Sequence, residues 1–236
     1  MTASAAPARP DSLSPELARR LARTSAVLLD FDGTVVNTVE LITASFRYTI
    51  KRVLGVELPD EVLIANLGMP LPEQMRGFSP EKEEELVRVY REHNRAHHDE
   101  MIKEFPGAKE ALEGLRAAGF KLALVTSKSR ELTQRGMDMF GLRPLFDAGV
   151  YMEDTQIHKP NPEPVVEALR RLGAAAEDAV FVGDSPHDIS AGRAAGVATI
   201  AALWGPFPRD RVLEARPDIV LESIDELVPA LAGPRT

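Results

Sequence analysis

The chain has 236 residues, a formal net charge of −8, and 44% hydrophobic and 27% charged residues. This composition is ordinary for a soluble globular protein with one α/β domain and an insertion, or with two small domains. The acidic balance argues against nucleic acid or an anionic membrane as the main partner, and the lack of cysteine excludes disulfides, thiolate metal sites and cysteine nucleophiles. No segment reaches the roughly 20 apolar residues that span a bilayer, and no signal peptide is recognisable, so a cytoplasmic location is expected.

The N-terminal residues 1–23 are rich in Ala, Pro, Ser and Arg. We expect a tail that is disordered at first and then forms a short helix. Ser14 is a plausible N-cap, and Pro15 follows it at the first helical position.

The first predicted strand is a short apolar run at residues 27–29, typical of a central strand covered on both faces. Asp30, Asp32, Gly33 and Thr34 follow at its carboxyl end. Residues two apart in an extended chain point to the same side, so both carboxylates are expected at the sheet edge where open α/β folds bind ligands. The alternative is a simple turn, because Asp and Gly often end strands.

Residues 38–105 show helical spacing and no strand alternation. The pattern predicts helices over residues 41–53, 60–66, 71–77 and 79–101. Gly55 is a suitable C-cap for the first of them. A helical unit of this length, inserted directly after the acidic loop, indicates a cap subdomain.

From Phe105 onward, strands alternate with helices. Strands are predicted at residues 121–125, 148–151, 179–182, 197–201 and 218–221, and helices at 107–118, 129–140, 162–172, 187–195 and from 223. This alternation implies βαβ units with right-handed crossovers. The predicted fold class is therefore α/β, with a parallel sheet flanked by helices.

Two further strand ends carry residues that suit phosphate. Thr126, with Ser127 after it, could donate hydrogen bonds to a phosphoryl oxygen, although a Thr there is more often a cap or turn residue. Lys159 lies in a Pro-rich segment just before a helix, where the prolines restrict the backbone, and its ammonium could neutralise a phosphoryl group. A lone loop Lys is otherwise usually solvated.

A second acidic loop follows the apolar strand at residues 179–182. Asp184 and Asp188 lie four apart across a strand-to-helix turn, where Asp184 could also serve only as an N-cap. Carboxylates at two strand ends, without a Cys or His cluster, favour a hard cation, and Mg²⁺ is the usual one beside phosphate.

These four stretches, in this order, resemble the motifs of the haloacid dehalogenase (HAD) superfamily of phosphohydrolases. The resemblance covers residues 24–230 and implies a HAD-like Rossmannoid core with an inserted all-helical cap. It divides the chain into a tail at 1–23, a core at 24–37 and 106–236, and a cap at 38–105. Caps of this kind occur in phosphoglycolate phosphatases, β-phosphoglucomutases and PpaX-type pyrophosphatases, and segments 90–100, 159–164 and 217–218 look most like the last.

The resemblance implies that Asp30 attacks phosphorus to form an aspartyl-phosphate. Asp32 would protonate the leaving group and then activate water. Mg²⁺ would be held by the Asp30 carboxylate, the Asp32 backbone carbonyl and Asp184. Asp188 would bind it through water or orient Asp184.

The phosphoryl oxygens would be held by the loop after the first strand, by the second motif at residues 126–127 and by the third motif at Lys159. The residues implied for this role are Gly33, Thr126, Ser127 and Lys159. A carboxylate at position 32 favours phosphoryl transfer over dehalogenation, because a halide leaving group needs no proton. A phosphomutase keeps both aspartates and is not excluded. A phospho-acceptor domain is the alternative hypothesis in which the protein is not an enzyme.

The predicted substrate is inorganic pyrophosphate, with phosphoglycolate or another small phosphomonoester as the alternative. A cap suited to pyrophosphate should offer cations. The candidates are Arg47, Lys51, Arg76, Arg91 and Arg95. The loop at 68–71 is expected to face the site. The protein is expected to be a monomer or homodimer.

Five side chains outside the motifs also carry expectations. His93 and His97 share a helix face and would form either a metal site or, as we favour, a packing contact. Trp204 is expected near the seam with the cap. Met137 and Met139 are expected in the core.

Overall fold

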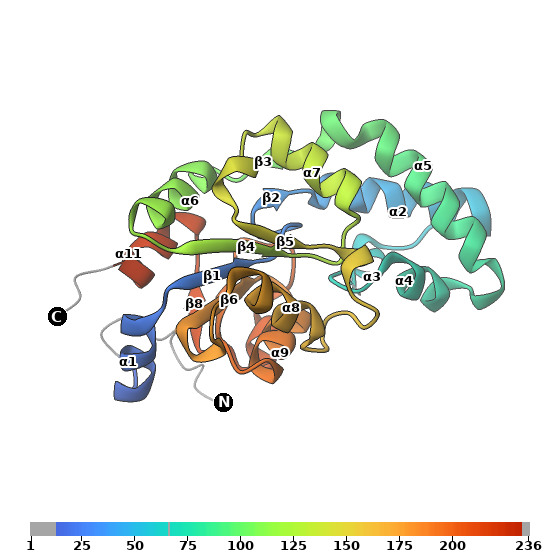
Figure 1. Ribbon diagram of the computed structural model, residues 1–236. Coiled ribbons are helices and arrows are strands. Elements are labelled where there is room, and N and C mark those ends of the chain that lie inside the picture. The colour runs from blue at the N-terminus through green and yellow to red at the C-terminus, as the bar shows by residue number, and fades with distance from the viewer. Residues whose placement is uncertain (1–12, 66, 233–236) are drawn as a thin grey trace.

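The computed structural model describes residues 13–65 and 67–232. Its centre is a six-stranded parallel sheet in the order β5-β4-β1-β6-β7-β8 (Figure 1). The strands are β1 (Ala26–Leu29), β4 (Lys121–Val125), β5 (Ala148–Val150), β6 (Ala179–Gly183), β7 (Ala198–Ala202) and β8 (Ile219–Leu221). In β1, Leu29 pairs with Leu124 on one side and with Val182 on the other. The acidic first loop therefore leaves the middle of the sheet, and the predicted α/β fold is confirmed.

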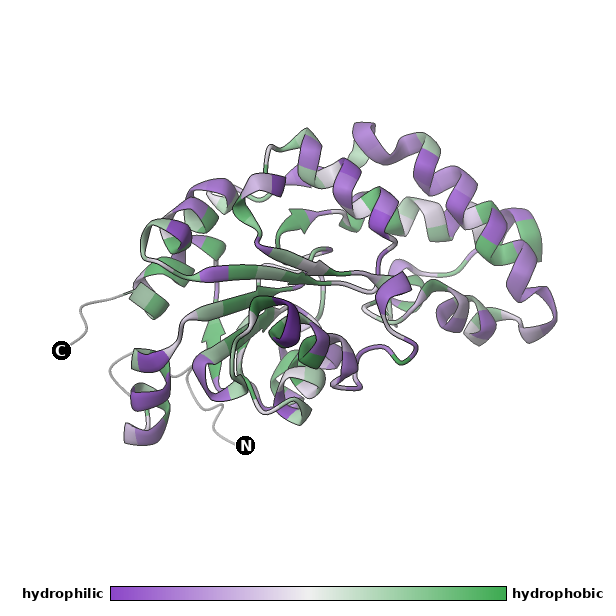
Figure 2. Ribbon diagram, in the orientation of Figure 1, coloured by the Kyte–Doolittle hydropathy of each residue, from purple (hydrophilic) through white to green (hydrophobic). Residues whose placement is uncertain are grey.

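Helices cover both faces of the sheet, as Figure 1 shows. They are α1 (Pro15–Arg23), α6 (Ala108–Ala117), α7 (Arg130–Met139), α8 (Glu163–Leu172), α9 (Pro186–Ala194), α10 (Arg209–Glu214) and α11 (Leu227–Ala232). One apolar cluster joins the sheet to α6, α7 and α11, and a second joins it to α8 and α9. The strands are hydrophobic along most of their length (Figure 2), as expected for a sheet covered on both faces.

The first of these helices confirms the N-terminal expectation in part. Ser14 caps α1, accepting a hydrogen bond from the Leu17 backbone amide, and Pro15 is its first residue. Arg20 at the middle of the helix donates to the Ala176 carbonyl of the core. The predicted disorder of the preceding tail concerns residues 1–12, which lie outside the described residues.

Four helices form a separate layer beside one end of the sheet (Figure 1). They are α2 (Val39–Leu54), α3 (Asp60–Leu63), α4 (Leu71–Phe78) and α5 (Glu83–Met101). They enclose an apolar cluster of their own, centred on Phe46, Met75 and Leu86. Gly55 ends α2 in the left-handed conformation at φ 72°, as its predicted C-cap role requires.

Short 3₁₀ turns complete the secondary structure. They lie at Pro80–Lys82, Arg143–Leu145, Met152–Asp154, Ala176–Asp178 and Ile224–Glu226. The first replaces the start of the helix predicted from residue 79. The helix predicted over 60–66 is shorter, ending at Leu63, and residue 66 is outside the described residues. No helix in the described ranges is long and apolar enough to cross a membrane.

Three further features differ from the sequence predictions. The chain enters and leaves the helical layer through a small antiparallel sheet of β2 (Val36–Asn37) and β3 (Lys103–Glu104), which was not predicted. Two residues are too few to show strand alternation. Helix α10 was also missed. Met139 is 47% exposed, so its predicted core position is wrong, whereas Met137 is buried.

Candidate active site

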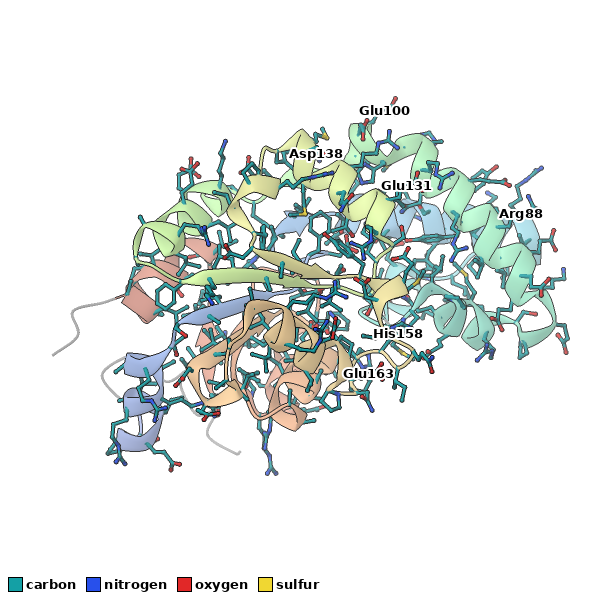
Figure 3. All side chains as sticks on the ribbon, viewed as in Figure 1. Arg88, Glu100, Glu131, Asp138, His158 and Glu163 are labelled. Carbon is teal, nitrogen blue, oxygen red and sulfur yellow. The ribbon has the colours of Figure 1, made fainter. Side chains whose placement is uncertain are left out.

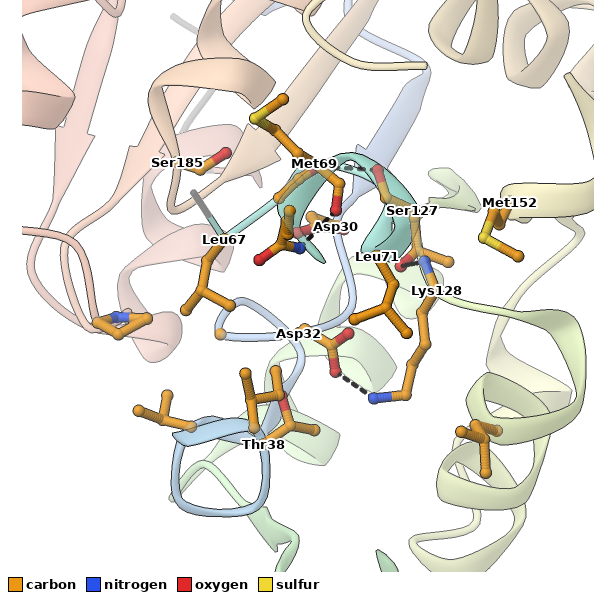
Figure 4. A pocket seen from close by; sticks show the side chains of 18 of the residues that line it. Asp30, Asp32, Thr38, Leu67, Met69, Leu71, Ser127, Lys128, Met152 and Ser185 are labelled. Carbon is orange, nitrogen blue, oxygen red and sulfur yellow. Dashed lines mark hydrogen bonds and ion pairs between the residues drawn. The ribbon is translucent and has the colours of Figure 1, made fainter. Parts of the chain in front are cut away.

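A pocket opens at the carboxyl end of the central strands, between the sheet and the helical layer (Figure 4). Asp30 follows β1, Thr126 follows β4 and Asp184 follows β6, and all three line it. Neighbouring parallel strands end at the same edge, which is why residues distant in sequence meet there. The helical layer contributes the opposite wall, including Leu67 and Leu71.

Three buried carboxylates lie close together at the base of this pocket, and two of them contact one buried ammonium. The Lys159 Nζ lies 2.9 Å from Asp30 Oδ1 and 2.6 Å from Asp188 Oδ1, and it also donates to the Val125 carbonyl. Burial raises the pKa of Asp30 to about 7, against the opposing effect of Lys159. Burial, together with the charges of Asp188 and Asp30, holds the pKa of Asp184 well above its usual value.

This arrangement fits a divalent cation. Asp30, Asp184 and Asp188 each offer a carboxylate oxygen within 4.8 Å of the others. Three carboxylates exceed the single charge of Lys159, and burial makes the excess costly without another positive charge. A donor set made only of oxygen suits Mg²⁺.

The three carboxylates are not equally free to bind a metal. Both oxygens of Asp188 are engaged: Oδ1 accepts from Lys159, and Oδ2 accepts from the Ser185 amide at 3.1 Å and hydroxyl at 2.6 Å. Asp184 accepts a hydrogen bond from Thr34 Oγ1 at 2.8 Å. Asp188 therefore fixes Lys159 and the loop, which leaves Asp30 and Asp184 as the better placed metal ligands.

The Asp32 carboxylate lines the same pocket as Asp30, as expected, but it is not among the three that could share a metal ion. It accepts a hydrogen bond from Lys128 Nζ at 2.8 Å (Figure 4), and the Lys128 side chain is only 9% exposed. Lys128 was not predicted from the sequence as a residue of the site. Its place two residues after Thr126, at the end of a central strand, was the available signal.

The second-motif residues have partners within the protein. Thr126 is buried, and its Oγ1 accepts from the Lys128 backbone amide at 3.1 Å. Ser127 Oγ donates to the Gly68 carbonyl at 2.8 Å, so this hydroxyl bridges to the helical layer. Both line the pocket, as does Gly33.

Comparisons with known proteins agree with this geometry. The family model described as haloacid dehalogenase-like hydrolase matches residues 27–202. The chain belongs to the haloacid dehalogenase-like hydrolases. It is thus an enzyme of the hydrolase class, as its sequence resemblance implied.

Named relatives of this hydrolase cover most of its length. It is 40% identical to pyrophosphatase PpaX from Halalkalibacterium halodurans over 86% of this chain and 95% of the relative. It is 36% identical to pyrophosphatase PpaX from Bacillus velezensis over 87% of this chain and 95% of the relative.

Solved structures share its fold. A haloacid dehalogenase-like family hydrolase from Streptococcus pneumoniae aligns with a TM-score of 0.78 and 26% identity, covering 87% of this chain and 97% of that one. A predicted phosphoglycolate phosphatase from Haemophilus somnus aligns with a TM-score of 0.76 and 23% identity over the same shares of the two chains.

Two glycines of the hydrolase leave just enough room for Asp184. Gly33 has φ 82°, and a Cβ there would lie 2.7 Å from Asp184 Oδ2. A Cβ on Gly205 would lie 2.3 Å from Asp184 Cβ. Trp204, expected near the seam with the cap, donates from Nε1 to the Thr34 carbonyl at 2.9 Å, and so steadies the loop that holds Asp184.

Replacing Gly205 by Ala is expected to destabilise the protein by about 1–3 kcal/mol, because the added methyl group must displace Asp184 or the backbone. Gly77→Ala is the control, since nothing lies within 4 Å of a Cβ there and the residue has a helical backbone in the last turn of α4. That change should stabilise by about 0.5–1 kcal/mol. Urea unfolding measures both, and equal effects of the two changes would show that the contact with Asp184 does not matter.

The cap cations predicted from sequence are mostly engaged elsewhere. Of the five, all within the described residues, only Arg91 lines the pocket. The others form ion pairs on the surface: Arg47 with Asp60, Lys51 with Glu57, Arg76 with Glu83, and Arg95 with Glu131. The Glu131 side chain, labelled in Figure 3, is 63% exposed. Four of the five candidates are therefore not placed to contact a substrate in the pocket, whereas the loop at 68–71 does face the pocket, as expected.

His93 and His97 form a packing cluster. Their ring centroids are 4.4 Å apart, and His93 also stacks on Tyr48 at 4.5 Å. The His93 Nδ1 is 3.1 Å from Ser45 Oγ. Within the described residues the three-ligand group around Asp30 is the one that could hold a metal, which supports the packing interpretation for these histidines.

Proposed function

We propose that this hydrolase is a Mg²⁺-dependent phosphohydrolase that forms an aspartyl-phosphate on Asp30. The observation that carries the proposal is the buried group of Asp30, Asp184 and Lys159 at the base of the pocket. It combines a carboxylate nucleophile, a fixed ammonium and an unbalanced negative charge that a metal ion would neutralise.

The proposed first step is attack of an Asp30 carboxylate oxygen on phosphorus. Lys159 reduces the repulsion between the two anions, because its ammonium lies 2.9 Å from Asp30 Oδ1. Mg²⁺ held by Asp30 and Asp184 would add charge neutralisation at the phosphoryl group. Gly33, Thr126 and Ser127 line the pocket, where the Thr126 hydroxyl and the Ser127 backbone amide can donate to phosphoryl oxygens. The Gly33 amide donates to the Val36 carbonyl and the Ser127 hydroxyl to the Gly68 carbonyl, so Gly33 shapes this wall and does not donate to it.

Asp32 is proposed to carry the protons. It gives one to the leaving-group oxygen, and then takes one from the water that hydrolyses the aspartyl-phosphate. Its hydrogen bond to Lys128 holds the carboxylate on the pocket side away from the metal ligands. This position, apart from Asp30 and Asp184, suits a carboxylate that must protonate the leaving group and does not bind the metal.

Inorganic pyrophosphate is the proposed main substrate. Two relatives at 40% and 36% identity carry the name pyrophosphatase, and the cations Lys128, Lys159 and Arg91 line the pocket. A small phosphomonoester such as phosphoglycolate is the second candidate. It is favoured by the apolar side chains Ile42, Leu67 and Leu71 on the helical side, which a fully charged substrate does not need.

Phosphate release with Mg²⁺ from pyrophosphate, 2-phosphoglycolate and a panel of sugar phosphates separates these candidates, with Asp30→Asn as the blank. A kcat/KM for pyrophosphate at least about tenfold higher, equivalent to roughly 1.4 kcal/mol, supports the first candidate. A higher value for a monoester would reject pyrophosphate and keep the chemistry. If no substrate gave phosphate release above the Asp30→Asn blank, the proposed phosphohydrolase function would be rejected.

The helical unit at residues 38–105 is proposed to act as a cap that closes over the substrate, with the core formed by 24–37 and 106–236 and the tail by 1–23. Its support is the separate apolar cluster of this unit and the contact of its loop at Gly68 with Ser127. A cytoplasmic location and a monomeric or homodimeric state stay predictions.

Mg²⁺ is expected to raise the melting temperature of the protein, because an ion that binds only the folded state stabilises it by about 2.7 kcal/mol at about 100 times its Kd. Asp184→Asn should largely abolish this shift by removing one of the two best placed ligands. Differential scanning calorimetry with and without MgCl₂ measures it. A full shift in Asp184→Asn would contradict the assigned site, and Asp225→Asn, outside the pocket, serves as the control.

A further inference from the structure

The three cations that line the pocket differ in what they contact. Lys159 is paired with the buried carboxylate of Asp30, and Lys128 is paired with that of Asp32. Within the described ranges 13–65 and 67–232, Arg91 forms no ion pair with a carboxylate. Among these three cations, its guanidinium is therefore the charge that no protein group neutralises.

The sequence of α5 explains why Arg91 is unpaired. Residues three and four positions apart on a helix are neighbours on its surface. The residues at those distances from Arg91 are Val87, Arg88, Asn94 and Arg95. None of them has a carboxylate, and the two arginines among them are paired with Glu92 and Glu131. The helix thus offers carboxylates to the neighbours of Arg91 and none to Arg91 itself.

Arg91 stands at the rim of the pocket, on the side of the helical layer. Its side chain is exposed, and it lines the pocket together with Tyr90 and Asn94 of the same helix. These two side chains are buried, and Asn94 Nδ2 donates to Tyr90 Oη at 3.4 Å. The helix under Arg91 is therefore held by buried contacts, whereas the long arginine side chain is free to meet a bound anion.

The direction of the proposed reaction shows which part of a substrate lies near Arg91. Asp30 lies at the base of the pocket, and the helical layer forms the opposite wall. In phosphoryl transfer the attacking and leaving oxygens lie roughly in line, on opposite sides of phosphorus. With Asp30 as the attacking group, the leaving part of the substrate extends away from the base, toward the wall that includes Arg91.

We propose that Arg91 binds a second anionic group of the substrate, on the part that leaves, and so favours such substrates over monoesters with an uncharged leaving group. The inference rests on the proposed phosphohydrolase function. A guanidinium offers paired N–H donors that match two oxygens of a phosphate or a carboxylate. Pyrophosphate and phosphoglycolate both present such a group, whereas an alkyl phosphate does not. Arg91 takes no part in the bonds that form and break, so it acts on substrate choice.

Three phosphonates with the same P–CH₂ unit test the proposal. Methylenediphosphonate, phosphonoacetate and ethylphosphonate end in a phosphonate, a carboxylate and a methyl group, and their P–C bonds are not hydrolysed by phosphoryl transfer. Isothermal titration calorimetry at one free Mg²⁺ concentration gives the Kd of each. Arg91→Gln should reduce the preference for methylenediphosphonate over ethylphosphonate by about tenfold, the effect of one charge-assisted pair. Arg91→Lys keeps the charge without the paired donors and should reduce it less.

The carboxylate analogue identifies the anion. Loss of affinity for both phosphonoacetate and methylenediphosphonate in Arg91→Gln supports a site for either anion. A loss for methylenediphosphonate alone restricts the site to phosphate, and a loss for phosphonoacetate alone restricts it to a carboxylate.

Arg88→Gln is the matched control. Arg88, labelled in Figure 3, lies on the same helix, is paired with Glu92 and is not among the residues that line the pocket. Unchanged affinities for both anionic analogues in Arg91→Gln would overturn the role of Arg91. An equal reduction in Arg88→Gln would also overturn it, because the effect would then come from the general charge of the helix. A wild-type protein that prefers neither anionic analogue to ethylphosphonate would overturn it as well.

The binding experiment does not depend on turnover, so the two proposals can fail separately. If Arg91→Gln binds all three phosphonates like the wild type while pyrophosphate is hydrolysed, the role of Arg91 is rejected and the phosphohydrolase stands. If no phosphate ester or anhydride is hydrolysed above the Asp30→Asn blank, the phosphohydrolase is rejected, and the reading of Arg91 as a substrate contact is rejected with it.

Discussion

Replacing Asp30 by Asn is expected to lower the turnover of pyrophosphate by about 10⁴-fold or more. The amide is not a nucleophile, so the aspartyl-phosphate cannot form, and it is also a poorer Mg²⁺ ligand than a carboxylate. The protein should still fold. Burial already raises the pKa of Asp30 to about 7, so a neutral group in its place removes a charge that burial disfavours.

Assays of phosphate release measure the turnover, and mass spectrometry of acid-quenched protein measures the phosphoryl group bound to it. Wild-type protein quenched in acid during turnover should carry one phosphoryl group, and Asp30→Asn should carry none. Asp138→Asn is the matched control, because this carboxylate is 57% exposed and paired with Arg143 outside the pocket. Near-normal turnover in Asp30→Asn would show that another residue, or water directly, attacks phosphorus.

Replacing Lys159 by Met is expected to destabilise the protein by about 3–5 kcal/mol and to abolish activity. Lys159 is 3% exposed and contacts two buried carboxylates, so its loss leaves their charges without a compensating ammonium. MgCl₂ should recover more stability in this variant than in the wild type, because the remaining carboxylates carry a larger uncompensated charge.

Urea unfolding with and without MgCl₂ checks both parts of this prediction. Lys103→Met is the control, since its ion pair with Glu40 is exposed on both sides and surface pairs contribute about 0–1 kcal/mol. If Lys159→Met unfolded with the same free energy as the wild type, the buried carboxylates would have to be neutral in the absence of the ammonium. Loss of stability with no response to MgCl₂ would argue against a cation site there.

Most of the core could be predicted from local patterns. The run at 27–29 is continuously apolar and became the central strand β1, and the alternation after residue 105 placed the other strands of the sheet. These signals are strong because a strand buried on both faces must be apolar at every position. The acidic residues after β1 and β6 then met in one pocket because parallel strands end at the same edge.

The errors in placing charged side chains share a physical cause. Arg47 and Arg95 were expected at the substrate, but each found a carboxylate on a neighbouring element. Spacing on one helix shows which residues share a face but not what another helix brings to it. Lys128 was overlooked for the same reason, because its partner Asp32 is 96 residues away in sequence.

The sequence by itself determined the α/β fold, the helical insertion and the identity of the chemical groups at the strand ends, because these depend on periodicity and on short motifs. Only the tertiary structure decided which of these groups contact one another. It placed Asp30 and Asp184 together, turned Asp188 toward Lys159 and Ser185, and set Asp32 apart. Side-chain partners are chosen by packing between distant segments, where burial makes each unpaired charge costly, and no local pattern contains that choice.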